Sequence, residues 1–343
     1  MSRLEYFLKR LLLMIPTFLG ITMVCFALCQ FVPGGPVEQR LARIRMGMAE
    51  QGGRPEASLR AEDIQAIRAY YGFDKPAPVR YWEWLVKNRL GVTAQSYKYP
   101  NRTVWELIVE RLPVSLIFGI TGFLLSYLIC IPLGIVKALR NNTAFDVASS
   151  VLVFVGYAIP PYALGMILKT TLCGTVEGWP DLFPHGGFTS DGFESLTLWG
   201  KSLDIARHMV LPVFCYMIGH FAFLTMLMKH SLLEEVAQDY VRTARAKGCS
   251  RWRTIWVHVL RNSLIPIATG LGGALTLMFA GSVLIENVFE IPGMGRLSLE
   301  CLVSRDYTVF MGILSITSLL TLLGNLLSDF CYVLIDPRID FAR

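Results

Sequence analysis

The feature that most constrains this chain is a series of about six apolar blocks, each near the ~20 residues that a helix needs to cross a bilayer. Inside a bilayer every backbone donor and acceptor needs a partner within the protein, so spanning segments of this kind are helices. Composition agrees, because 53% of the 343 residues are hydrophobic and 17% are charged. We therefore predict an all-helical integral membrane protein. The predicted spans are 11–32, 114–133, 147–168, 209–228, 264–285 and 309–335.

Lysine and arginine residues lie beside alternate ends of these blocks. Basic residues next to spans mark the cytoplasmic side, so both termini are predicted to be cytoplasmic. The first block is too long for a cleaved signal and has no small-x-small site before Pro33, which predicts an uncleaved span. Because the basic charge lies beside spans, a nucleic-acid partner is not expected. The basic residues that indicate this orientation are Arg3, Lys9, Arg10, Lys137, Arg140, Lys229, Arg338 and Arg343.

The longest polar insertion, 33–113, follows the first predicted span and is expected on the periplasmic side. It contains a Gly-, Pro- and Glu-rich patch at 51–63 that is typical of an exposed loop. A short amphipathic helix is predicted at 64–71, closed by Gly72. Aromatic residues after it suit a membrane interface. A second, turn-rich outer segment is predicted at 174–207.

The segment 230–262 is predicted to be a cytoplasmic loop, and its part 240–262 is strongly basic. Gly248 interrupts a helix-compatible run, which predicts a helix, a turn and a second helix leaving at an angle. Such a hairpin suits a socket on another protein. Its basic residues are Arg242, Arg245, Lys247, Arg251, Arg253 and Arg261.

The sequence has no complete nucleotide-binding, zinc-binding or nucleophile motif. Residues 200–202 read Gly-Lys-Ser like the end of a phosphate loop, but Ser195 stands where the first glycine belongs. The histidines have no HExxH spacing, and no GxSxG is present. We therefore predict no catalytic residue, no metal site and no bound cofactor. Energy for any transport must come from a partner or an ion gradient.

The eight cysteines lie mostly in apolar blocks and form no CxxC pair. Buried free thiols are the preferred interpretation. A disulfide between Cys173 and Cys301, both expected near the outer side, is the alternative.

Four residues inside the predicted spans are candidates for a translocation path. Tyr157 and Pro160 lie beside the consecutive prolines of the third span, which predict either a kink lining the path or a packing bend. Asn325 and Asp329 lie one helical turn apart in the last span. A polar contact between helices is favoured for this pair, and an ion-carrying role is the alternative.

Glu286 is a fifth candidate, predicted with Asn287 and Glu290 on the outer face just beyond the fifth span. Acidic groups there would attract the amino terminus of a peptide. The alternative is a solvated helix end.

Several short motifs run through nearly the whole chain: FVPGGP, YGFDKP, GYAIPP, GSVLIENVF, PGMGRL and DPRIDF. With them the chain resembles the permease subunits of bacterial ATP-binding-cassette importers of oligopeptides and dipeptides, and most closely their Yej-type branch of peptide and microcin C uptake. The basic loop is similar to that family's EAA loop. Here Arg242 replaces its acidic first residue, and Arg261 stands in place of a later proline.

This resemblance implies one transmembrane domain over 1–343 with the type I importer fold, forming half of a path for oligopeptides or microcin C-like conjugates across the inner membrane. The implied partners are a second homologous permease, an ATPase that binds the ATP, a periplasmic peptide-binding protein, the peptide substrate and membrane lipid. The alternative from the residues alone is an ion-coupled secondary transporter. The implied ATPase-coupling residues are Arg242, Thr243, Ala244, Arg245 and Gly248.

Overall fold

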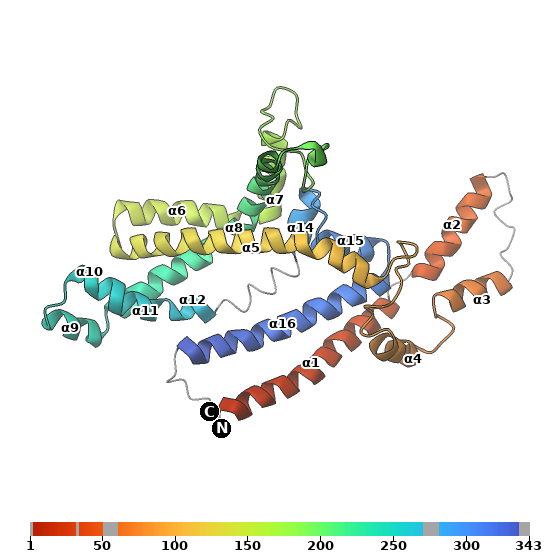
Figure 1. Ribbon diagram of the computed structural model, residues 1–343, viewed down its shortest axis with the longest axis horizontal. Coiled ribbons are helices and arrows are strands. Elements are labelled where there is room, and N and C mark those ends of the chain that lie inside the picture. The colour runs from red at the N-terminus through yellow and green to blue at the C-terminus, as the bar shows by residue number, and fades with distance from the viewer. Residues whose placement is uncertain (1–2, 32–33, 51–60, 270–280, 336–343) are drawn as a thin grey trace. The chain divides into compact units, whose positions relative to one another are not determined.

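The computed structural model describes residues 3–31, 34–50, 61–269 and 281–335 (Figure 1). Within these ranges the regular structure is helical, apart from two isolated β-bridges, Gln95 with Thr103 and Cys173 with Asp181. The predicted all-helical class is confirmed.

The chain divides into two compact units. Unit 1 comprises Met1–Arg10, Arg111–Arg296 and Leu320–Arg343. Unit 2 comprises Leu11–Glu110 and Leu297–Leu319.

Unit 2 contains most of the segment predicted to be periplasmic. The amphipathic helix expected at 64–71 is present as α3, and the Gly72 amide donates to the Ala69 carbonyl at its end. The helices that lie wholly or partly in this unit are α1 (Arg3–Phe31), α2 (Pro36–Glu50), α3 (Ala61–Tyr70), α4 (Ala77–Trp82), α5 (Val104–Leu139), α15 (Met294–Val303) and α16 (Tyr307–Ile335).

Asp306 fixes the loop at 96–98 to the start of α16. Its carboxylate is fully buried and accepts hydrogen bonds from the Ser96 hydroxyl and from the amides of Tyr97 and Lys98, all within 3.0 Å. It also accepts from the Val309 amide in the first turn of α16. One carboxylate therefore caps a helix and holds a loop more than 200 residues away in sequence.

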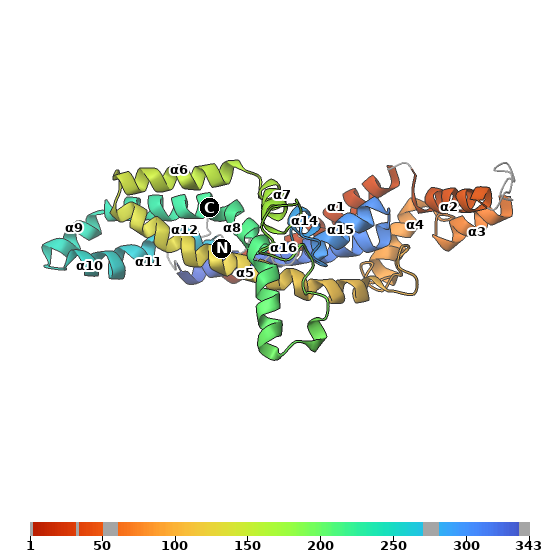
Figure 2. The same ribbon diagram turned by 90° about the horizontal axis from the view of Figure 1, so that it is seen from above.

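Unit 1 is built around α5, α6 (Ala144–Ala158), α7 (Pro161–Leu172) and α8 (Leu198–Val236). Figure 2 shows α6 running beside α8, and the two are in contact. Gly134 lets α5 approach α8 closely, since a Cβ atom there would lie 2.6 Å from the Met228 Cβ and 2.7 Å from the Thr225 carbonyl oxygen. The apolar core that results continues into the segment after α8.

Among the described residues, α1, α5, α8 and α16 are long and apolar enough to cross a membrane. The predicted span 147–168 corresponds to α6 and α7, which meet at an angle of 91°, so the bend expected at the consecutive prolines is present. Ile159 is extended before Pro160, and Pro161 begins α7, as expected where a residue precedes proline. If this bent pair counts as one span, the described spans number up to five.

The predicted span 264–285 includes residues 270–280, which lie outside the described residues. Its described ends are α12 (Ile265–Thr269) and the beginning of α14 (Val283–Val288). The total of six spans therefore stays a prediction.

Candidate functional site

The basic segment forms a helical hairpin, which we call the coupling hairpin. It consists of α9 (Asp239–Ala246) and α10 (Arg251–Arg253), which continues through the π-helical turn Thr254–Val259 into α11 (Leu260–Ser263). The turn lies at Gly248, as the sequence predicts.

Gly248 has a left-handed backbone with φ of +85°, the conformation that glycine adopts most easily. Its amide donates to the Arg245 carbonyl, and the next amide, of Cys249, donates to Ala244, so α9 ends in a Schellman motif. Ser250 then caps α10 by accepting from the Arg253 amide. Local chain chemistry therefore determines the reversal of direction.

Apolar packing anchors the coupling hairpin to the helices of unit 1. Val241 of α9 and Val259 are buried in a core that includes Cys130 of α5 and Leu232 of α8. The Tyr240 hydroxyl donates to the Glu235 carboxylate at 2.6 Å. The pKa of Tyr240 is raised to about 12, mainly by burial and to a smaller extent by this hydrogen bond. The hairpin therefore shares one close-packed core with α5 and α8.

The outward surface of the hairpin is cationic and aromatic. Trp252 and Trp256 are both exposed, with ring centroids 5.3 Å apart. Tryptophan and arginine are enriched where proteins bind one another. The basic residues of the hairpin were predicted from the sequence, but the two tryptophans were not. Their i, i+4 spacing on a polar helix was the available signal. Of the predicted coupling residues, Ala244 is half-buried, and those exposed are Arg242, Thr243, Arg245 and Gly248.

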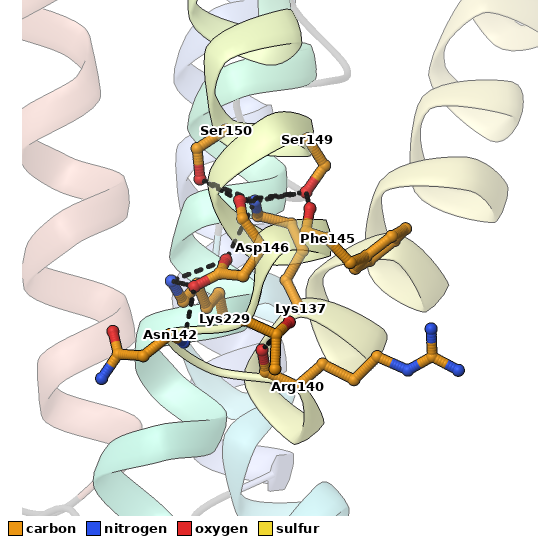
Figure 3. Close-up of polar contacts among 9 residues, drawn as sticks. Lys137, Arg140, Asn142, Phe145, Asp146, Ser149, Ser150 and Lys229 are labelled. Carbon is orange, nitrogen blue, oxygen red and sulfur yellow. Dashed lines mark hydrogen bonds and ion pairs between the residues drawn. The ribbon is translucent and has the colours of Figure 1, made fainter.

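A buried charge cluster joins three helices of unit 1 (Figure 3). Lys137 of α5 and Lys229 of α8 both point at Asp146 in the first turn of α6. The Lys229 Nζ lies 2.7 and 2.8 Å from the two carboxylate oxygens, and the Lys137 Nζ lies 3.1 Å from one of them. Lys137 is fully buried and Asp146 nearly so.

The remaining polar atoms of this cluster are also satisfied. Lys137 donates to the Asp146 carbonyl and to the hydroxyls of Ser149 and Ser150 at 2.7–2.9 Å. The Asn142 amide donates to the Asp146 carboxylate. Sequence reasoning used the two lysines only as markers of the cytoplasmic side and missed Asp146. A lone carboxylate directly before an apolar block was the signal for it.

The candidate path residues do not come together in one pocket. Tyr157 and Pro160 are exposed beside the break between α6 and α7. Asn325 is exposed on α16, whereas Asp329 is largely buried and forms an ion pair with Arg10, whose Nε lies 2.6 Å from the carboxylate. Their roles in a path stay predictions.

Glu286 is fully buried, which differs from the outward position that we expected. Its carboxylate accepts from the Ser115 hydroxyl of α5 and from the Arg296 amide, both at 2.9 Å. Glu286 is buried because α14 packs against α7 and α8 instead of ending in solvent.

Asn287 and Glu290, the two neighbours predicted with Glu286, are exposed. Glu290 pairs with Lys169 at 2.8 Å, and this partner holds the pKa of Glu290 below its ordinary value.

In the ranges that the structure describes, no three His, Cys, Asp or Glu side chains gather as a metal site. Cys173 and Cys301, the alternative disulfide pair, are both buried free thiols.

Residues 130–341 match the family described as "Binding-protein-dependent transport system inner membrane component". The chain is 39% identical to the "Peptidoglycan transport system permease protein YejB" of Agrobacterium fabrum and 40% identical to the "Inner membrane ABC transporter permease protein YejB" of Escherichia coli O157:H7, with 98% of each chain covered in both cases. It is 33% identical to the "Dipeptide transport system permease protein DppB" of Escherichia coli K12, again over 98% of both chains.

A solved structure of the MetNI methionine ABC transporter, in an inward-facing conformation, is similar in fold. The TM-score is 0.50 at 16% identity, covering 68% of this chain and 97% of that one. The family match and the relatives together show that this chain belongs to the inner membrane components of binding-protein-dependent transport systems, and within them to the Yej-type permeases.

Proposed function

We propose that this chain forms half of an ATP-driven path that imports oligopeptides across the bacterial inner membrane. Relatives of nearly equal length are named as dipeptide, oligopeptide and peptidoglycan permeases, which supports a peptide-containing substrate. Microcin C-like peptide conjugates would use the same path.

The observation that carries the proposal is the exposed coupling hairpin on a rigid base. Its tryptophans and arginines would dock on a partner ATPase, and its packing against α5 and α8 would carry the closure of that ATPase into the spans. The chain would bind no cofactor of its own, since ATP is held by the partner.

Two further partners belong to this proposal. A second homologous permease would complete the path and cover the exposed apolar residues of α6, among them Val147, Val151 and Val155. A periplasmic peptide-binding protein would deliver substrate to the outer side. With the hairpin in the cytoplasm, both termini lie there as well.

The alternative is an ion-coupled secondary transporter that uses Asp329 as the ion carrier. The ion pair between Asp329 and Arg10 favours a structural role, because the carboxylate already has a charged partner within the chain.

Reconstitution tests the proposal. The chain, its partner permease and the ATPase are placed in proteoliposomes with the peptide-binding protein, and uptake of a labelled oligopeptide is measured. We expect uptake with ATP and none with a proton gradient alone. Uptake that follows the gradient and ignores ATP would establish the secondary transporter instead.

A further inference from the structure

Unit 2 contains a cavity of about 500 Å³ between the end of α1, the start of α16 and residues 69–97. This volume is in the range of small-molecule sites. Aromatic side chains form much of its wall: Phe26, Tyr71, Phe73, Trp84, Tyr97 and Tyr307.

Arg80 brings a positive charge to this wall. Its Nη2 donates to the neutral Gln30 amide oxygen at 2.6 Å, and its guanidinium lies 4.3 Å from the centre of the Phe73 ring. Burial lowers the pKa of the Arg80 guanidinium from its ordinary value. Among the described residues no carboxylate pairs with Arg80, whereas Arg102 of the same unit pairs with Glu110 at 2.6 Å.

The cavity wall also holds hydrogen-bond donors that have no acceptor in the described part of the chain. These are the Arg80 Nε, the Trp84 Nε1 and the Tyr307 hydroxyl, all buried. Glu83 lines the cavity too, but its carboxylate is occupied by Lys75 at 2.7 and 2.9 Å. Buried donors are normally paired, so the Arg80 Nε, which comes from a lining residue and has no acceptor within the described ranges, calls for an external one.

A planar carboxylate suits an unpaired arginine because the guanidinium offers parallel donors, and aromatic walls suit an adjoining apolar group. The carboxyl terminus is the anion that every unmodified peptide carries. We propose that the Arg80 cavity is a binding subsite for the terminal carboxylate of a peptide, with the side chain of its last residue against the aromatic wall. This inference rests on the proposed function for the class of substrate.

The test measures binding separately from transport. The intact complex of both permeases and the ATPase, in nanodiscs without peptide-binding protein or ATP, is titrated calorimetrically with Ala-Ala-Phe and with the same tripeptide amidated at its carboxyl terminus. We expect the free acid to bind about tenfold more tightly, in line with one hydrogen-bonded charged group. Equal affinities for acid and amide would overturn the subsite.

Two variants and a matched control locate the effect. Arg80→Met should abolish the preference for the free acid, and Arg80→Lys, which keeps the charge but loses the planar fork, should retain a smaller preference. Arg102→Met removes an arginine that already has a carboxylate partner and should leave the preference unchanged. A preference that survives in both Arg80 variants, or is lost equally in Arg102→Met, contradicts the assignment.

Elution of each variant as an intact complex is the control for folding, and Arg80→Lys carries the test if Arg80→Met does not assemble. The proposed function is judged separately by ATP-driven uptake. If ATP-driven uptake fails while the complex still prefers the free acid, the proposed function is wrong. If uptake is intact but the free acid is not preferred, the subsite is wrong.

Discussion

At the scale of single residues, Gly248 is the clearest case of a backbone requirement. A Cβ atom at Gly248 would meet no atom within 4 Å, so a substitution there acts through backbone strain and not through a clash. The left-handed conformation costs an ordinary L-residue about 1–2 kcal/mol, and more for a β-branched one, whereas asparagine tolerates it.

Gly248→Val should therefore leave the chain inserted in the membrane but reduce both peptide uptake and co-purification of the ATPase. Gly248→Asn is the matched control and should retain most of both activities. Normal uptake and co-purification in the valine variant would show that the shape of the turn does not matter for coupling.

Asp329 is the second residue whose role a single change decides. Asp329→Asn removes the charge but leaves an amide oxygen to accept from Arg10, so assembly and most ATP-driven uptake should survive. Uptake is measured in ATP-loaded vesicles. A fall to background with intact assembly would favour an ion-carrying Asp329.

At the scale of helices, the cluster of Lys137, Asp146 and Lys229 holds α5, α6 and α8 together. Asp146→Asn would leave two lysines without their anion in a buried site. Breaking a buried ion pair in this way typically costs about 3–5 kcal/mol.

The stability of the complex in detergent, measured by thermal unfolding, should fall accordingly. Glu194→Gln, which breaks the solvent-exposed pair with Lys201, is the control and should change little. Equal stability of the two variants would mean that the cluster does not hold the helices.

The crossing of α5 and α8 at Gly134 provides a second prediction at this scale. Gly134→Ala places a methyl group within 2.7 Å of atoms of α8 and should destabilise the chain by about 1–3 kcal/mol. Gly20→Ala is the control, since no atom lies within 4 Å of a Cβ atom at Gly20 of α1. The same loss of stability in both variants would show that the effect does not come from the crossing.

At the scale of the whole molecule, the proposed topology places the coupling hairpin and Asn287 on opposite sides of the membrane. Both Arg245 and Asn287 are exposed, so a cysteine at either position is accessible to a reagent. In intact cells, with the native cysteines replaced, an impermeant thiol reagent should label Asn287→Cys but not Arg245→Cys. The reverse pattern would overturn the orientation of every span.

Much of this protein follows from short stretches of sequence. Long apolar blocks have no stable state in a bilayer except the helix, and α1, α5, α8 and α16 form where such blocks occur. The turn of the coupling hairpin follows from Gly248 and from Ser250 two residues later, because capping depends on neighbours within one helical turn.

Other features depend on which segments meet, and the tertiary structure alone decides that. Asp146 could not be matched to Lys229, 83 residues away, without knowing that α6 runs beside α8. The sequence predicts Glu286 at the outer surface, whereas in the structure it is buried and accepts from Ser115 of α5, 171 residues earlier. The prolines at 160–161 predicted a break, but its angle of 91° depends on how α7 packs against α8 and α14. Helices form through contacts between residues a few positions apart, and these can be read from the sequence. Buried charges are paired by packing between segments far apart in the chain, and which segments pack together cannot be read from the sequence.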